Sequence, residues 1–433
     1  MCANYEEANN IINKYGQEHL LYGYEKLEDS EKQKLVNQIM NIDFDQINNL
    51  FKNIKNDTKK EKEKIEPIAY IEKSEINETD GKRYFEKGVE AIKQGKLAVV
   101  TMAGGQGTRL GHKGPKGTFM LGTTPNKSLF EILCDNLKEA KEKYNVIIPW
   151  YIMTSRENNK QTIEFFEKNN YFNYPKELIK FFKQGELPML DTEGRVLVGE
   201  DGLIKQAADG HGGIFEAMFK NNVFDDMKQK NIEWVFVGPV DNPLSKLVDE
   251  EAIGLAIEKD VMGLGKSLVK LNPEEKVGVF CIKNGRPSVV EYTEITDEMA
   301  RATNEKGDLV YGESHINCNM FNIKGLEKIG SNKLPYHVAF KKANYMDKSG
   351  NIIVAEEPNA YKFESFIFDA FGKLDNMLIY RVKREEEFSP VKNATGVDSA
   401  ETAREAYNRK INNKSCSNWF VNRKEWGKIW KNI

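Results

Sequence analysis

Three glycines within four positions, followed by an arginine, form the stretch of this sequence best suited to chemistry. Gly104, Gly105 and Gly107 precede Arg109, and the loop continues to Pro115-Lys116-Gly117. Glycines carry no Cβ, so backbone amides can approach a bulky anion closely. The Arg109 guanidinium offers a bidentate fork and the Lys116 ammonium a point charge, and both suit a polyphosphate. The alternative, a glycine-rich turn with two solvated cations, is disfavoured because strand, glycines, arginine and the Pro-Lys pair occur together.

Two common phosphate-binding motifs do not match this chain. A Walker A motif needs G-x-x-x-x-G-K-[ST]; Gly265-Lys266-Ser267 ends like one, but Asp260 occupies the place of the leading glycine. A dinucleotide fingerprint needs a third glycine where the loop has Leu110. The remaining pattern, G-G-x-G-T-R-L-G followed by P-K, is long and specific.

The segments around the loop alternate between apolar runs and helical patterns. The loop leaves the apolar run 97–102, which is bounded by glycines and is typical of a buried strand. Similar runs follow at 146–153, 234–237 and 277–282, and a helix is expected over 128–143. This alternation predicts an α/β fold with a largely parallel sheet covered by helices on both faces. Ligands bind such sheets at the carboxyl ends of the strands, where the glycine loop lies.

Two flanking regions differ from this central part. Residues 1–95 are predicted to be a helical N-terminal region, with Ser30 and Gln33 as a capping box. Residues 96–384 would form the α/β domain and residues 385–433 a small C-terminal domain. The last segment ends in an aromatic, basic tail that contains Trp419, Phe420, Trp426 and Trp430.

The composition excludes several classes of protein. The 63 basic and 66 acidic side chains give a net charge of -3, whereas nucleic-acid-binding domains are usually basic. The five cysteines are scattered and odd in number, so we expect neither a disulfide framework nor a zinc site. We find no signal peptide and no apolar segment of membrane-spanning length. We therefore expect a cytoplasmic protein with small-molecule ligands, no nucleic-acid partner and no membrane contact; the sequence does not indicate an oligomeric state.

The loop pattern resembles the signature of sugar-nucleotide pyrophosphorylases. Further segments resemble the eukaryotic-type UDP-N-acetylglucosamine pyrophosphorylases of the UDP-sugar pyrophosphorylase family; they are residues 16–21, 149–155, 289–292, 336–339 and 387–394. The resemblance implies a Rossmann-like mixed sheet flanked by helices, of the nucleotidyltransferase type, between a helical N-terminal region and a small C-terminal domain. It also implies the reaction UTP + sugar 1-phosphate → UDP-sugar + pyrophosphate.

The resemblance further implies roles for individual residues. Nucleotide contacts are expected from Ala103, Gly104, Gly105, Gly107, Gln184 and Gly210, with Gln184 on the uracil edge. The expected catalytic cations are Arg109, Lys116 and Lys392; the sugar-side contacts are His211, Glu291 and Asn319; Asp241 is the expected metal ligand. A sugar 1-phosphate is already ionised at neutral pH, so the reaction needs alignment and charge neutralisation rather than a general base. We expect Mg²⁺ to bridge Asp241 and phosphate oxygens, because Mg²⁺ commonly takes one or two carboxylates.

The identity of the sugar is less well determined. The N-acetylhexosamine branch has asparagine at the position of His211, whereas the UDP-glucose and broad-specificity branches have Gly-His-Gly. Residues 313–317 also differ from the Asn-Ala-Gly-Asn segment of the hexosamine branch. N-acetylglucosamine 1-phosphate is the expected substrate, with glucose 1-phosphate or a broad range of sugars as alternatives.

Two other functions are less consistent with the sequence. A metal-dependent glycosyltransferase would need Asp-x-Asp after a central strand, but Asp43-Phe44-Asp45 lies in the N-terminal helical region. A non-catalytic nucleotide-binding protein is expected to have lost some of the proposed catalytic residues. Because Arg109, Lys116, Asp241 and Lys392 are all present, an enzyme is the favoured interpretation.

Overall fold

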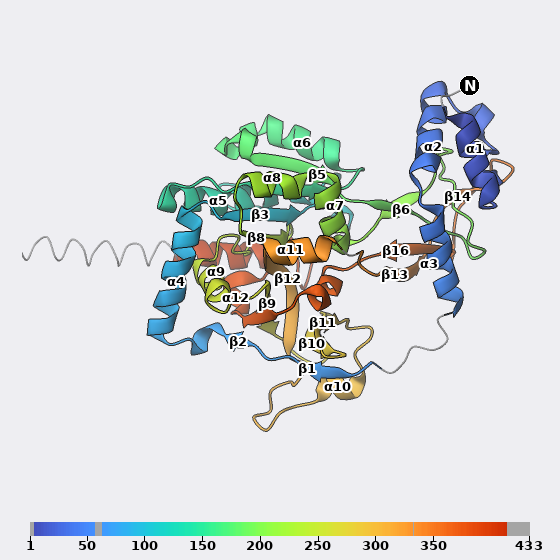
Figure 1. The fold of residues 1–433 in the computed structure, drawn as a ribbon. Coiled ribbons are helices and arrows are strands. Elements are labelled where there is room, and N and C mark those ends of the chain that lie inside the picture. The colour runs from blue at the N-terminus through green and yellow to red at the C-terminus, as the bar shows by residue number, and fades with distance from the viewer. Residues whose placement is uncertain (1–3, 57–62, 332, 414–433) are drawn as a thin grey trace, which may run out of the picture. The chain divides into compact units, whose positions relative to one another are not determined.

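The computed structural model describes residues 4–56, 63–331 and 333–413, which divide between two compact units (Figure 1). Unit 1 comprises Met1–Glu63, Gln184–Ile214 and Lys333–Ala370; unit 2 comprises Lys64–Lys183, Phe215–Asn332 and Phe371–Ile433. The units cut across the three consecutive parts expected from the sequence. Residues 64–95 belong to the unit that contains the central sheet, whereas residues 184–214 and 333–370 belong to the unit that contains the N-terminal helices. The tryptophan-containing tail lies outside the described residues.

Unit 2 is built on an 11-stranded mixed sheet in the described part of the chain. Its main path runs β2-β17-β9-β12-β8-β3-β4-β5. The path strands are β2 (Ile71–Glu72), β3 (Leu97–Met102), β4 (Trp150–Thr154), β5 (Ile179–Lys183), β8 (Trp234–Pro239), β9 (Gly263–Val269), β12 (Glu313–Asn322) and β17 (Met377–Arg381). The side strands are β1 (Ile65–Pro67), β10 (Val279–Lys283) and β11 (Arg286–Val290). Strand β12 runs antiparallel to β8 and β9, and the other neighbours on the path are parallel. The expected α/β fold with a mixed sheet is confirmed.

Helices flank this sheet (Figure 1). They are α4 (Glu78–Lys93), α5 (Leu129–Tyr144), α6 (Asn159–Lys168), α7 (Ile214–Lys220), α8 (Val223–Gln229), α9 (Glu250–Glu258), α10 (Asp297–Arg301), α11 (Ile323–Gly330) and α12 (Arg384–Glu387), with a last helix over 400–413. Helices α4, α5, α6 and α9 share one core with the side chains of Leu97 and Val99. The predicted helix over 128–143 is α5, and the Ser128 hydroxyl caps it by accepting from the Glu131 N–H at 3.1 Å.

Helix α4 packs on α9 through two facing glycines, which explains why residues 64–95 belong to unit 2. A Cβ at Gly88 would lie 1.8 Å from the carbonyl oxygen of Glu250, and one at Gly254 would lie 1.6 Å from that of Tyr84. No other residue type allows the two backbones to approach so closely.

Unit 1 combines helices with three two-stranded ribbons. The helices are α1 (Tyr5–Lys14), α2 (Asp29–Asn41) and α3 (Phe44–Asn56). The ribbons pair β6 (Glu186–Pro188) with β7 (Gln206–Ala208), β13 (His337–Lys341) with β16 (Ala360–Glu364), and β14 (Tyr345–Met346) with β15 (Ile352–Ile353). One apolar core joins the helices to Leu190, Val196 and Phe363.

The capping box predicted at Ser30 and Gln33 is wrong. Helix α2 begins at Asp29, and Glu28 and Glu31 form the box instead. Carboxylates can make the same reciprocal bonds to backbone N–H groups, and these two lie where the chain turns into the helix. Within the described segments, no helix is long and apolar enough to cross a bilayer.

Candidate active site

The glycine-rich loop leaves the carboxyl end of β3 and folds back on itself. The Gly107 N–H donates to the Gly114 carbonyl at 2.9 Å, and the Lys116 N–H donates to the Gly105 carbonyl at 3.0 Å. The buried side chain of Asn158 donates to the carbonyls of Ala103 at 2.9 Å and Gly105 at 3.3 Å. The loop is therefore held from two sides before any ligand binds.

The glycines of this loop serve different purposes. A Cβ at Gly105 would meet no atom within 4 Å, so its missing side chain leaves open space for a ligand. A Cβ at Gly107 would lie 2.8 Å from the His112 side chain, and one at Gly117 only 2.2 Å from the Phe130 ring. Gly107 and Gly117 thus keep the loop compact, whereas Gly105 offers a backbone that a bulky anion can approach.

The structure brings Lys116 and Asp241 together. The Lys116 Nζ lies 2.9 Å from the Asp241 Oδ2, and both side chains are largely but not wholly buried. The bond from the Val240 N–H to the Met102 carbonyl, 3.1 Å long, sets the end of β8 beside the start of the loop. An anion that enters here meets an ammonium group already oriented by a carboxylate. Arg109 is exposed in a 3₁₀ turn that spans Thr108–Leu110.

The segment that carries Lys392 is anchored to the backbone at Asp241. The Val391 N–H donates to the Asp241 carbonyl at 2.8 Å. Asn242, fully buried, donates from Nδ2 to the Glu387 carbonyl at 2.7 Å and accepts from the Ser389 N–H at 3.0 Å. The Lys392 Nζ itself lies 3.2 Å from the Asp398 Oδ2.

A buried ion cluster supports the segment that carries Lys392, because Glu387 takes part in both. The Lys266 ammonium donates to the Asp249 Oδ2 at 2.6 Å and to the Glu387 carboxylate, and all three side chains are buried. Burial by itself would lower the pKa of Lys266, but the two carboxylates outweigh it and hold the pKa above its usual value. The incomplete Walker A pattern around Lys266 therefore belongs to strand β9 and to an ion cluster, not to a phosphate loop.

Strand β12 places Asn319 in a buried bulge. The pairing of β12 with β9 shifts register between His315 and Asn319, and Asn317 has a φ of 61°. The Asn319 Oδ1 lies 3.3 Å from the His315 Nε2. Its Nδ2, the Asn317 Oδ1 and the Ser314 Oγ are buried without a hydrogen-bond partner among the described residues. Such orphaned groups in one segment suit a ligand that carries hydroxyl and amide groups.

Glu291, the other expected sugar contact in unit 2, directly follows β11. Its carbonyl accepts from the Glu294 N–H at 2.9 Å and the Ile295 N–H at 3.0 Å, so the chain turns at this residue. The Glu291 Oε1 lies next to Gly278, at 3.1 Å from the position of a Cβ there. This close approach constrains where the carboxylate lies.

The remaining expected contacts lie in unit 1, at one end of the β6–β7 ribbon. Gln184 precedes β6 and is half-buried, while Gly210 and His211 follow β7. Gly210 has a φ of 85°, and a Cβ there would lie 2.3 Å from the Ser365 carbonyl oxygen. The Ser365 N–H donates to the Asp209 carbonyl at 2.7 Å. The turn 209–213 is thus held tightly by the segment that follows β16.

His211 is fixed in one tautomer by this packing. The Ile367 N–H donates to the His211 Nδ1 at 3.1 Å, so the ring proton is on Nε2. The ring also lies against Phe366, with ring centroids 5.4 Å apart. Burial lowers the pKa of His211 to about 4, against 6.5 for an unperturbed histidine. At neutral pH the imidazole is therefore uncharged and has a single N–H to donate.

Other polar residues considered from the sequence have structural roles. The Asp43 Oδ1 accepts from the Gln46 N–H at 2.9 Å at the start of α3, so the Asp-x-Asp pair begins a helix. His337 has a structural contact as well, because its Nε2 lies 2.9 Å from the Asp369 Oδ2.

Asp241 offers a magnesium ion one carboxylate, so a bound ligand would have to supply further oxygen atoms. Among the described residues, no group of three or more His, Cys, Asp or Glu side chains could hold a metal ion. Mg²⁺ usually keeps several waters and binds through one or two carboxylates plus substrate phosphates. A single carboxylate beside the open backbone at Gly105 is consistent with that arrangement.

Asn158 and Asn242 hold the backbone around the candidate site, and the sequence alone did not indicate these contacts. Each follows a buried strand of the sheet, Asn158 after β4 and Asn242 after β8. A position after a buried strand marks both residues as parts of loops that leave the sheet. Their hydrogen-bond partners, the carbonyls of Gly105 and Glu387, are distant in the sequence and could not be predicted from it.

Comparison with known proteins gives a consistent result. The family model UTP–glucose-1-phosphate uridylyltransferase matches residues 43–410. The UDP-N-acetylglucosamine pyrophosphorylase of Saccharomyces cerevisiae is 36% identical over 417 residues, covering 90% of this chain and 87% of the yeast protein. UDP-N-acetylglucosamine diphosphorylase 2 of Arabidopsis thaliana is 34% identical over 412 residues, covering 90% and 80%. The crystal structure of the UDP-N-acetylglucosamine pyrophosphorylase from Trypanosoma brucei in complex with an inhibitor matches with a TM-score of 0.80 at 28% identity, covering 94% of this chain and 84% of that one. The chain belongs to the UTP–glucose-1-phosphate uridylyltransferase family.

Proposed function

We propose that this protein transfers the uridylyl group of UTP to N-acetylglucosamine 1-phosphate and releases pyrophosphate. The observation that carries the proposal is the Lys116–Asp241 ion pair beside the open backbone at Gly105. That arrangement suits a triphosphate with a metal ion. The sugar follows from the relatives with 34% and 36% identity, which are named for UDP-N-acetylglucosamine.

The reaction needs no general base in this scheme. An ionised oxygen of the sugar 1-phosphate attacks the α-phosphorus of UTP, a new P–O bond forms, and the bond to the oxygen bridging the α- and β-phosphorus breaks. Arg109 and Lys116 neutralise the departing pyrophosphate, and Lys392 acts near the α-phosphate or the incoming phosphate. Asp241 would hold Mg²⁺, which supplies positive charge to the phosphate oxygens when it is bound.

The substrate contacts follow the same proposal. The loop residues Ala103, Gly104, Gly105 and Gly107 contact the nucleotide through their backbone, and Gln184 and Gly210 are further nucleotide contacts. The sugar side is assigned to His211, Glu291 and Asn319. The buried, unpartnered Nδ2 of Asn319 supports its assignment, because a sugar hydroxyl or acetamido oxygen would satisfy it.

A cytoplasmic location is part of the proposal as well. Cys134 and Cys318 are buried cysteines that form no disulfide in the described part of the chain. Reduced cysteines are typical of the cytosol.

Glucose 1-phosphate is a second candidate, and one observation favours it. His211 occupies a position where the hexosamine branch has asparagine, and it offers an Nε2–H donor from a rigid ring instead of an amide. Pyrophosphate release with Mg²⁺, UTP and, in turn, the 1-phosphates of N-acetylglucosamine, N-acetylgalactosamine and glucose tests the proposal. The highest kcat/KM is expected for N-acetylglucosamine 1-phosphate. A preference for glucose 1-phosphate would change the assigned sugar substrate. Release of pyrophosphate with none of the three sugar 1-phosphates would refute the proposed enzymatic activity.

A further inference from the structure

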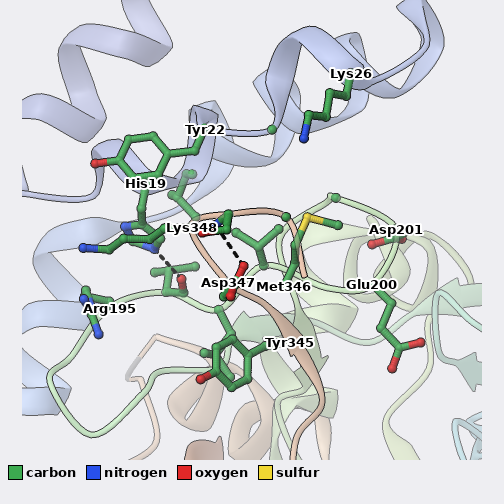
Figure 2. A pocket seen from close by; sticks show the side chains of 18 of the residues that line it. His19, Tyr22, Lys26, Arg195, Glu200, Asp201, Tyr345, Met346, Asp347 and Lys348 are labelled. Atoms are coloured by element: carbon green, nitrogen blue, oxygen red, sulfur yellow. Dashed lines mark hydrogen bonds between the residues drawn. The ribbon is translucent and has the colours of Figure 1, made fainter. Parts of the chain in front are cut away.

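Unit 1 contains a cavity of about 400 Å³ with walls from three segments of the chain (Figure 2). These segments are residues 19–27, 191–202 and 345–350. The ammonium ends of Lys26 and Lys348 lie on far sides of the cavity, and so do the rings of Tyr22 and Tyr345 (Figure 2). Neither pair can hold one group of a ligand between its members, so the cavity defines no ligand. A pair of polar side chains in direct contact lies in unit 2, on strand β12.

His315 and Asn319 lie at the two ends of the bulge in β12. His315 is opposite Ser267 of β9 and Asn319 is opposite Gly265, so β12 carries extra residues between them. In a regular strand, residues four positions apart are separated by about 13 Å. The bulge, in which Asn317 has a φ of 61°, shortens this separation. It thus brings the His315 Nε2 to 3.3 Å from the Asn319 Oδ1.

The direction of this hydrogen bond follows from the chemistry of the two groups. An amide oxygen cannot donate, so the His315 Nε2 carries the proton and donates to the Asn319 Oδ1. A flipped amide would set two N–H donors against each other. The imidazole therefore decides which end of the carboxamide faces away from it. That end is the Asn319 Nδ2, which is buried and has no hydrogen-bond partner among the described residues.

The ring of His315 is itself held by its surroundings. It packs edge-to-face on Phe280 and on Phe371, with ring centroids 4.8 Å and 5.5 Å apart. The His315 N–H donates to the Gly278 carbonyl at 2.8 Å. Gly278 in turn lies next to the Glu291 carboxylate, whose Oε1 is 3.1 Å from the position of a Cβ there. His315 is thus linked to both expected sugar contacts of unit 2.

We propose that His315 is a positioning residue for the sugar 1-phosphate. Its Nε2–H holds the Asn319 carboxamide so that Nδ2 is presented to the ligand. The presented group is a donor, so the ligand group recognised there is an oxygen acceptor, such as a sugar hydroxyl or an acetamido carbonyl. His315 acts through Asn319 and does not contact the substrate itself. This role rests on the proposed function, because the sugar belongs to that reaction.

Two variants separate the hydrogen bond of His315 from its packing. His315→Phe keeps an aromatic ring between Phe280 and Phe371 but removes the donor, whereas His315→Gln removes the ring and supplies an N–H donor again. With the sugar 1-phosphate that gives the wild type its highest kcat/KM, His315→Phe should raise the KM for this sugar by about 5–10-fold, and kcat and the KM for UTP should stay within ~2-fold. His315→Gln should keep the KM for the sugar within ~2-fold of the wild type. The reverse order of the two variants would overturn the role and show that the ring serves packing alone.

The dependence on Asn319 is tested by a double-mutant cycle. If His315 acts through Asn319, adding His315→Phe to Asn319→Ala should raise the KM for the sugar no further. Independent, additive effects of the two substitutions would overturn the positioning role. Urea unfolding of each variant shows whether a change in KM accompanies a loss of stability.

Binding without turnover distinguishes a failure of this role from a failure of the proposed function. Calorimetric titrations of the full chain with UDP-N-acetylglucosamine, UDP-glucose and UDP measure what the sugar adds to the affinity. For the UDP-sugar that the wild type binds more tightly, His315→Phe should weaken binding by about 5–10-fold and leave UDP binding unchanged, and His315→Gln should restore it. This pattern in a protein that releases no pyrophosphate would refute the enzymatic activity but support the role of His315. Equal binding of that UDP-sugar by the wild type and His315→Phe, or an equal loss of UDP binding, would overturn the role of His315.

Discussion

The ammonium group of Lys116 lies 2.9 Å from the carboxylate of Asp241, although 125 residues separate them in the chain. The pair joins the loop that follows β3 to the residue that follows β8, at the carboxyl ends of two parallel, adjacent strands. Parallel pairing makes such a meeting possible, because neighbouring parallel strands deliver their following loops to one edge of the sheet.

Loss of either member of this pair should abolish most of the activity without unfolding the protein. Lys116→Ala and Asp241→Ala are each expected to lower kcat by about 100-fold or more, because a preorganised charge at the reacting phosphates is removed. Pyrophosphate release measures the rate, and circular dichroism measures the fold. Lys127→Ala is the matched control, since the Lys127–Asp135 pair is of similar length, 2.6 Å, but lies outside the loop. Near-normal rates in the first two variants would refute their roles.

Two glycine variants separate ligand binding from packing in the same loop. Gly105→Ala places a methyl group in open space, so it should leave the free energy of unfolding unchanged while UTP binding weakens by at least ~10-fold. Gly117→Ala pushes a methyl group into the Phe130 ring and should destabilise the protein by about 1–3 kcal/mol. Calorimetric UTP titration and urea unfolding provide the two measurements. An unaltered UTP affinity in Gly105→Ala would show that the nucleotide does not approach this backbone.

The buried cluster at Lys266 should be essential for stability. Lys266→Met leaves the carboxylates of Asp249 and Glu387 without their shared cation, and the free energy of unfolding should fall by about 3–5 kcal/mol. The exposed Lys160→Met, whose Nζ lies 3.8 Å from Glu164, is the control and should unfold like the wild type. Equal unfolding midpoints for both variants would contradict the assigned role.

His211 should contribute a specific pH dependence of stability. Its pKa is about 4 in the folded protein and near 6.5 when unfolded, so between these values the unfolded chain binds more protons. Stability should therefore fall as the pH drops from 6.5 to 4, by on the order of 3 kcal/mol from this residue, and be unaffected by it above 6.5. His211→Asn removes the titration but keeps an acceptor for the Ile367 N–H. If urea unfolding gives parallel curves of stability against pH for the two proteins, the buried neutral imidazole is disproved.

Much of the central fold could be predicted from local sequence. The apolar run at Leu97–Met102 is strand β3, and the helix expected over 128–143 is α5, since both signals depend only on neighbouring residues. The capping box predicted at Ser30 and Gln33 is wrong, because Glu28 and Glu31 form a box at the same turn. A local pattern fits both pairs and does not show which pair caps the helix.

What could not be predicted depends on contacts across long separations. Lys266 looked like the end of an incomplete phosphate loop, and only its pairing with Glu387, 121 residues away, explains it. The tautomer of His211 likewise depends on Ile367, which is 156 residues distant. Unit 1 combines the N-terminal helices with residues 184–214 and 333–370. No local sequence pattern indicates this grouping, because a shared apolar core holds the three segments together although they are not continuous in the chain.

Transfer of label from UTP is the most direct test of the central claim. UTP labelled at its α-phosphate is incubated with Mg²⁺, N-acetylglucosamine 1-phosphate and either the wild-type protein or Gly105→Ala. The wild type should place the label in UDP-N-acetylglucosamine and release unlabelled pyrophosphate in equal amount, and Gly105→Ala should do so much more slowly at low UTP. Label that stays in UTP, or equal transfer by both proteins at low UTP, would contradict a uridylyl transfer that depends on this glycine loop.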